Sequence, residues 1–115
     1  MKVSIIGSGY VGTVSAACFA ELGHEVICID IDEEKVKQIN AGIPPIYEEG
    51  LEDLMQKHAE HHLIATSDYD YAVTNSDVSF ICVGTPSGDD GSIDLSIVRA
   101  ASASLGRAIA KKEGY

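Results

Sequence analysis

Gly7-Ser8-Gly9-Tyr10-Val11-Gly12 is the stretch that decides the fold, because its glycines follow the spacing G-x-G-x-x-G. Lys2 to Ile6, directly before it, is short, apolar and partly β-branched, which is typical of a buried strand. Val11 to Leu22, directly after it, is rich in alanine and stops at Gly23. Its larger apolar residues recur every three or four positions and predict a helix that buries Val11, Val14, Cys18 and Leu22. A strand, a glycine turn and a helix therefore follow one another without a gap.

The three glycines have separate tasks in such a turn. Gly7 is expected to make the tight bend, and Gly9 to let a pyrophosphate approach the backbone. Gly12 is expected to let the helix pack closely on the strand. The amides of Tyr10 and Val11 open the helix, where N–H groups without partners and the helix dipole favour an anion. The stretch therefore predicts a dinucleotide site, whereas a glycine turn without a ligand is the alternative.

An acid at the end of the next strand strengthens that prediction. Glu25 to Ile29 is the second apolar strand, and Asp30 follows it, 18 residues after Gly12, close to the expected ~20. Asp32 is well placed to cap the following helix, which leaves Asp30 to accept the ribose hydroxyls. A carboxylate there favours NAD, because it would repel the 2′-phosphate of NADP. Lys35 is close enough in sequence to reach the same ribose, although a solvated surface lysine is the commoner reading.

The rest of the chain continues the alternation of strands and helices. It predicts strands at Leu63 to Thr66 and Val78 to Val83, and helices at Glu33 to Ala41, Leu51 to His58, Tyr69 to Asn75 and Asp94 to Lys111. This order is typical of a Rossmann-type doubly wound parallel sheet with helices on both faces. The fourth strand should lie beside the first, where Val83, Gly84 and Thr85 can contact the ligand, whereas a simple strand-to-loop turn is the alternative. The last helix lacks a following strand, so residues 1–115 are expected to be one NAD-binding domain, truncated before its later strands and N-terminal in a longer protein.

Composition excludes several classes of function. Eight basic against 18 acidic residues leave a formal charge of −10, which argues against nucleic acid and membrane surfaces as partners. Three widely spaced cysteines in apolar segments are expected to be reduced core residues of a cytoplasmic protein. His58, His61 and His62 lack partners at ligand spacing and are expected to be a solvated helix end, so no metal site is predicted. We find no catalytic residues in the pattern.

Several segments together resemble one family. They are Gly7 to Gly12, Gly23 to Val26, Ile39 to Gly42, Pro45 to Leu51 and Asp77 to Pro86, with Gly91 to Leu95 after them. On these residues the whole chain resembles the N-terminal NAD-binding domain of the UDP-glucose/GDP-mannose dehydrogenase family. The segment from Pro45 to Leu51 and the turn Val83-Gly84-Thr85-Pro86 are the specific parts. Glu49 departs from the family pattern, which usually has proline there.

The resemblance implies an oxidoreductase that converts a nucleotide sugar, such as UDP-glucose, to its uronate with two NAD, as in polysaccharide biosynthesis. It implies that Val11, Asp30, Lys35 and Thr85 contact NAD. It also implies that the substrate is held mainly by downstream domains, that the catalytic residues lie beyond Tyr115, and that the full-length enzyme is a homo-oligomer. Two alternatives remain at this point: an NAD-sensing module of the kind that regulates potassium transport, and the N-terminal domain of another NAD dehydrogenase.

Overall fold

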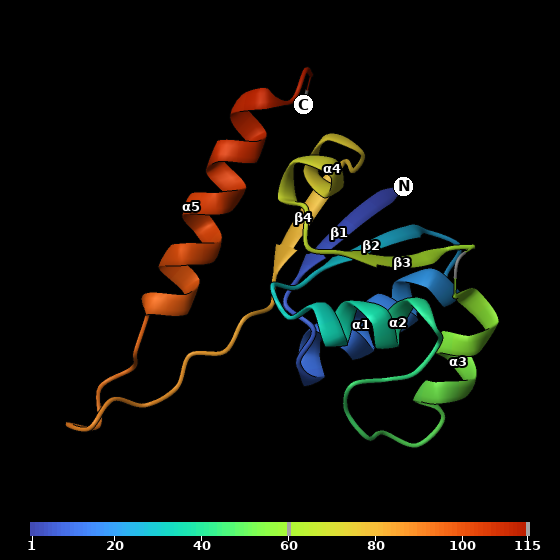
Figure 1. The fold of residues 1–115 in the computed structure, drawn as a ribbon, viewed down its shortest axis with the longest axis horizontal. Coiled ribbons are helices and arrows are strands. Elements are labelled where there is room, and N and C mark those ends of the chain that lie inside the picture. The colour runs from blue at the N-terminus through green and yellow to red at the C-terminus, as the bar shows by residue number, and fades with distance from the viewer. Residues whose placement is uncertain (60, 115) are drawn as a thin grey trace.

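The computed structural model describes residues 1–59 and 61–114 of the chain. Four strands and five helices are assigned in these residues (Figure 1). They are, in chain order, β1 (Lys2–Ile6), α1 (Tyr10–Glu21), β2 (Glu25–Ile29), α2 (Glu33–Asn40), α3 (Leu51–His58), β3 (Leu63–Thr66), α4 (Tyr69–Thr74), β4 (Val78–Ile81) and α5 (Ser96–Lys111). No helix within the described ranges is long and apolar enough to cross a membrane.

The strands form one parallel sheet in the order β3-β2-β1-β4. β4 pairs with β1, as the sequence predicted. The sheet has a helix layer on each face, with α1, α2 and α3 on one side and α4 and α5 on the other (Figure 1). Val3 and Ile5 of β1 pack into the cluster beneath α1, α2 and α3, whereas Ile6 packs on the opposite face, with Ala72 and Ala101. The predicted Rossmann-type doubly wound fold is confirmed.

The buried face of α1 differs from the predicted one. Val11 and Leu22 are 63% and 74% exposed and Cys18 is also exposed, while Val14 is only partly buried. The buried positions are instead small: Gly12, Thr13, Ala16, Ala17 and Ala20. They also recur every three or four residues, so periodicity alone does not choose between the two faces. Small side chains allow the helix axis to lie close to the sheet, so the face with the small residues is the one that is buried.

The β4 side of the sheet is less covered than the β2 side. β4 ends at Ile81 rather than Val83, although the Cys82 amide still donates to the Ile6 carbonyl at 2.8 Å. Val78, Phe80 and Ile81 are partly exposed because β4 lies at the sheet edge. An extended segment then leads away from the sheet and returns to α5, with one antiparallel bridge between Ser87 and Ile93 (Figure 1).

α5 begins at Ser96, two residues later than predicted, and packs against α4. Along its apolar face, Ala101 is buried and Leu105 is partly buried, whereas Ile97 and Ile109 are exposed. The helix therefore contacts the rest of the domain along only part of that face.

Candidate functional site

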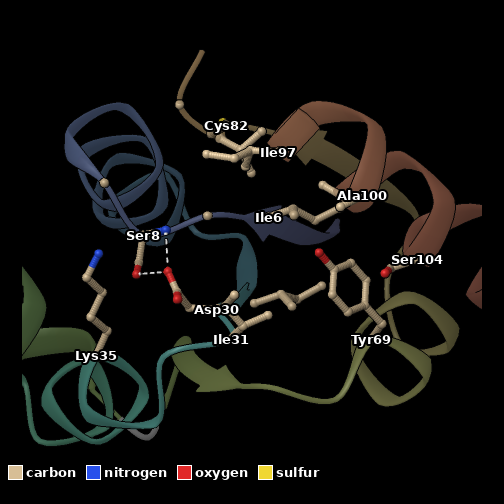
Figure 2. Close-up of a pocket in the computed structure, with 16 residues that line it drawn as sticks. Ile6, Ser8, Asp30, Ile31, Lys35, Tyr69, Cys82, Ile97, Ala100 and Ser104 are labelled. Carbon is tan, nitrogen blue, oxygen red and sulfur yellow. Dashed lines mark hydrogen bonds between the residues drawn. The ribbon is translucent and has the colours of Figure 1, made fainter. Parts of the chain in front are cut away.

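A pocket of about 410 Å³ lies where β1 and β2 end, at the carboxyl edge of the sheet (Figure 2). Its lining comes from the glycine turn after β1, the segment after β2, Lys35 of α2, the segment after β4, Tyr69 of α4 and residues 97–104 of α5. The carboxyl ends of the strands beside a change in strand order are where open α/β sheets bind ligands. In this sheet the strand order reverses at β1, which has β2 on one side and β4 on the other.

Six of the ten predicted cofactor residues line this pocket: Gly7, Gly9, Asp30, Lys35, Val83 and Gly84. Tyr10, Val11, Gly12 and Thr85 do not. Tyr10 and Val11 are exposed at the first turn of α1, Gly12 is buried in that helix, and Thr85 is exposed beyond the pocket rim. The structure thus brings the glycine turn, the acid and the β4 turn into one site.

Gly7 and Gly12 are required by the packing of the chain itself. Gly7 has a φ of +101°, and a Cβ there would lie 2.7 Å from the Cys82 carbonyl oxygen. A Cβ on Gly12 would collide with the Gly7 carbonyl oxygen. These two glycines therefore shape the turn, and any side chain at either position would push it apart.

Gly9 differs from the other two, because no chain atom lies within 4 Å of the place where its Cβ would be. Its backbone is extended, with φ −75° and ψ −161°, and it precedes α1 without offering a side-chain cap. The first N–H groups of a helix have no intrahelical acceptor, and the helix dipole makes this end positive. The space beside Gly9 and the amides of Tyr10 and Val11 together fit a pyrophosphate.

Asp30 is held by the turn it faces. Its Oδ2 accepts hydrogen bonds from the Ser8 amide at 3.0 Å and from the Ser8 hydroxyl (Figure 2). Its Oδ1 accepts from the Asp32 amide at 2.9 Å. Asp32 caps α2 as predicted, accepting from the Glu34 amide at 3.0 Å. Asp30 is therefore less free than the sequence suggested, because it braces the turn while it faces the pocket.

Lys35 lines the pocket, whereas Tyr10 does not. Lys35 reaches up from α2 on the side of the pocket where Ser8 and Asp30 lie (Figure 2). The Tyr10 hydroxyl points away to the loop before α3 and donates to Glu48 Oε2 at 2.5 Å. That hydrogen bond and the charge of Glu48 raise the pKa of Tyr10 above its ordinary value.

Sequence reasoning missed the residues that close the pocket from α4 and α5. Tyr69 points into it, and burial together with the nearby Asp30 raises the pKa of this phenol (Figure 2). Ile97, Ala100 and Ser104 face it from α5. Ser8 was also missed, although its position inside the glycine motif was a usable signal. The others have no local signal, since they join the site only when α4 and α5 fold over the sheet.

Two of the three cysteines, Cys28 and Cys82, have thiols that are disfavoured as nucleophiles. Cys28 is buried in β2, and burial raises the pKa of its thiol to about 12. Cys82 lines the pocket, is partly buried, and also has a raised pKa because of burial. A thiol with a raised pKa is a poor nucleophile at neutral pH. The prediction of a core position is confirmed for Cys28 and wrong for Cys18, whose helix turns the other face to the sheet.

The histidine segment is only partly the solvated helix end that was expected. His61 and His62 are exposed, but His58 is buried and its Nε2 lies 2.7 Å from Glu21 Oε2. This contact joins α3 to α1. Across residues 1–59 and 61–114, no group of three His, Cys, Asp or Glu side chains is arranged to hold a metal ion.

Comparison with known proteins connects this site to a family. The family model described as "UDP-glucose/GDP-mannose dehydrogenase family, NAD binding domain" matches residues 1–113. UDP-glucose 6-dehydrogenase AglM of Haloferax volcanii is 52% identical over 98% of this chain and 26% of its own length. GDP-mannose 6-dehydrogenase of Pseudomonas aeruginosa is 47% identical over 97% of this chain and 26% of its own length.

Solved structures agree with these matches. A ternary complex of GDP-mannose dehydrogenase from Pseudomonas aeruginosa superposes with a TM-score of 0.96, at 46% identity, over 99% of this chain and 26% of that one. A UDP-glucose dehydrogenase from Pyrobaculum islandicum gives a TM-score of 0.91 at 42% identity, over 96% of this chain and 26% of that one. The chain thus spans about a quarter of the length of the relatives it matches.

Proposed function

The chain belongs to the UDP-glucose/GDP-mannose dehydrogenase family, as its NAD binding domain, and from this premise we propose that its pocket holds NAD for the oxidation of UDP-glucose to UDP-glucuronate. The observation that carries the proposal is the open space at Gly9. It lies next to the start of α1 and in the same pocket as Asp30. The family match over residues 1–113 decides against a potassium-transport sensing module and against a dehydrogenase of another family.

Each predicted residue has a place in this proposal. Gly7 and Gly12 shape the turn, and Gly9 leaves room for the pyrophosphate, which the amides of Tyr10 and Val11 bind. Asp30 and Lys35 hold the adenosine ribose. Val83, Gly84 and Thr85 lie at the end of β4 and contact the cofactor from the opposite side of β1. The proposed domain is residues 1–115.

NAD supplies the hydride acceptor in such a reaction, and this chain supplies binding and orientation. The raised pKa values of Cys28 and Cys82 argue against either thiol as a nucleophile. In a chain as long as the relatives, we place the contacts to the nucleotide sugar and the catalytic groups mainly outside residues 1–115. A homo-oligomeric enzyme in the cytoplasm is part of the same proposal.

The nucleotide sugar is the finer part of the proposal. UDP-glucose is favoured by a UDP-glucose 6-dehydrogenase at 52% identity. GDP-mannose is the second candidate, because the GDP-mannose dehydrogenase structure superposes with a TM-score of 0.96. A chain extended to the relatives' length, assayed for NAD reduction with each sugar in turn, distinguishes them.

Titration calorimetry of this chain with NAD tests the cofactor part. We expect saturable binding by residues 1–115 and no NAD reduction when UDP-glucose is added. Absence of NAD binding at millimolar concentration would contradict the proposed site. Turnover by this chain at rates normal for an enzyme would contradict the placement of the chemistry elsewhere.

A further inference from the structure

The Ser8 hydroxyl is bonded to Asp30, the carboxylate that is proposed to hold the ribose. Ser8 is 1% exposed, and its hydroxyl donates to Asp30 Oδ2, the oxygen that already accepts from the Ser8 amide at 3.0 Å. Asp30 is the one acceptor that this hydroxyl reaches within residues 1–59 and 61–114. The turn and the proposed ribose site therefore compete for the same carboxylate (Figure 2).

The acceptor capacity of Asp30 is nearly used before any ligand binds. An ionised carboxylate has two oxygens, each with about two acceptor positions. Oδ2 fills both of its positions with the amide and hydroxyl of Ser8, whereas Oδ1 fills one with the Asp32 amide at 2.9 Å. One position remains, and it is on Oδ1.

The Ser8 hydroxyl is not needed to orient Asp30. The amides of Ser8 and Asp32 already hold one oxygen each, and both amides belong to the backbone. Thr13 fixes the turn independently, since its buried hydroxyl donates to the Ser8 carbonyl at 2.9 Å. The hydroxyl of Ser8 therefore occupies an acceptor position without adding a necessary restraint.

We infer that Ser8 sets the number of ribose hydroxyls that Asp30 can hold: one, on Oδ1, rather than the two that a free carboxylate takes. This inference rests on the proposed NAD site. Ser8 is then a residue that limits cofactor affinity from within the glycine turn. For a second ribose hydroxyl to bind Oδ2, the buried Ser8 hydroxyl must give up its hydrogen bond, and an unsatisfied buried donor is costly.

The test compares ADP, 2′-deoxy-ADP and 3′-deoxy-ADP, which carry the adenosine half of NAD, on wild type and Ser8→Ala by titration calorimetry. Ser8→Ala frees one position on Oδ2. We expect it to bind ADP about tenfold more tightly, the equivalent of one hydrogen bond to a charged acceptor. The ratio of deoxy-ADP to ADP dissociation constants should rise about tenfold for one analogue and stay unchanged for the other.

Ser104→Ala is the matched control, because it removes a serine hydroxyl that lines the same pocket and is bonded to Arg107 instead of Asp30. It should leave both ratios at their wild-type values. Ser8→Gly removes the Ser8 hydroxyl a second way and should repeat the Ser8→Ala pattern. Circular dichroism establishes that each variant is folded.

Weaker ADP binding by folded Ser8→Ala would show that the hydroxyl orients Asp30, and would overturn the inference. Unchanged ratios in both Ser8 variants would overturn it as well. Wild-type chain that binds neither ADP nor NAD would instead overturn the proposed function, and the inference with it.

Discussion

The two walls of the pocket are held in different ways. The loop wall is Gly7 to Gly9 with Asp30, and it continues into α1 as far as Gly12. It is braced at successive residues: the Gly7 amide donates to the Ile29 carbonyl at 2.8 Å, and Ser8 is bonded to both Asp30 and Thr13. The β4 wall, Cys82 to Gly84, follows an edge strand. After the bond from the Cys82 amide to Ile6, Val83 and Gly84 donate no backbone hydrogen bond within the described residues.

This difference teaches where the shape of the site comes from. The loop wall is determined by a few neighbouring residues, so small changes there should be costly. The β4 wall gains little from its own hydrogen bonds, and Phe80 and Ile81 beside it are partly exposed. It should therefore tolerate changes that the loop wall does not.

The largest expected effect is on stability, and it contrasts one glycine from each wall. Gly12→Ala places a methyl group against the Gly7 carbonyl oxygen, whereas Gly84→Ala meets no atom within 4 Å. We expect Gly12→Ala to lower the free energy of unfolding by about 1–3 kcal/mol, as overpacking does. Gly84→Ala should change it by less than about 0.5 kcal/mol. Urea unfolding measures both, and equal losses would remove the difference between the walls.

The second effect is on binding, and it stays within the loop wall. Gly9→Val has room for its side chain and an ordinary φ of −75°, so the variant should fold. The valine would occupy the space proposed for the pyrophosphate. Charge-assisted hydrogen bonds lost there are worth about 1.5–3 kcal/mol each, so NAD affinity should fall at least about tenfold. Unchanged affinity by calorimetry, with wild-type unfolding in urea, would mean that the phosphate does not lie at this turn.

The loop wall was also the part that the sequence predicted best. The bounds of β1, β2, β3 and α3 agree with prediction, because strong local patterns delimit these elements. The face of α1 was wrong because large apolar side chains were weighted above small ones. In this helix, the close approach of α1 to the sheet decides burial, and only Ala, Thr and Gly permit it.

The far side of the pocket had no comparable signal. Tyr69 and Ser104 belong to helices that were predicted, but their place in the pocket depends on how α4 and α5 pack on the sheet. The length of β4 also depends on a neighbour, since an edge strand has a partner on one side only. Local pattern therefore predicts elements, and tertiary contacts decide which side chains share the site.

The third prediction concerns cofactor choice at Asp30. Wild type should prefer NAD to NADP, because the 2′-phosphate of NADP would face a carboxylate. Asp30→Ser should weaken NAD binding about tenfold, through loss of one hydrogen bond to a charged acceptor. It should also reduce the difference between the affinities for NAD and NADP. Because Asp30 also braces Ser8, Asp30→Asn is the comparison: it keeps an acceptor for the Ser8 amide while removing the charge. Dissociation constants for both cofactors at fixed salt measure the ratio.

If the ratio of the NAD and NADP dissociation constants were unchanged in both Asp30 variants, this carboxylate would only stabilise the turn. A ratio that shifts in Asp30→Asn with little loss of NAD affinity would assign discrimination to charge alone. Either outcome separates the structural task of Asp30 from its proposed task toward the ribose.

The smallest expected effect is on the rates at which the three cysteine thiols are chemically labelled. Cys82 lies in the β4 wall at the pocket, Cys28 is buried in β2, and Cys18 is exposed on α1. A thiol reacts as its thiolate, and burial raises the pKa of Cys82 and brings that of Cys28 to about 12. At pH 7.5 we expect Cys18 to be labelled first, Cys82 slowly and Cys28 only after unfolding. Raising the pH below the pKa of Cys82 should speed its labelling about tenfold per unit, because the thiolate fraction rises in that proportion.

NAD makes this order a test of the β4 wall. Bound cofactor should cover Cys82 and leave Cys18 accessible, so NAD at a concentration equal to its dissociation constant should slow Cys82 labelling about twofold, by mass action. Cys82→Ser should remove the class of thiol that responds to NAD, which mass spectrometry of the labelled chain can assign. If NAD protected Cys18 instead, the cofactor would lie over the exposed face of α1 and not between the two walls. If NAD protected neither thiol while calorimetry showed saturation, the loop wall alone would hold the cofactor. The β4 wall would then contribute no contact near Cys82.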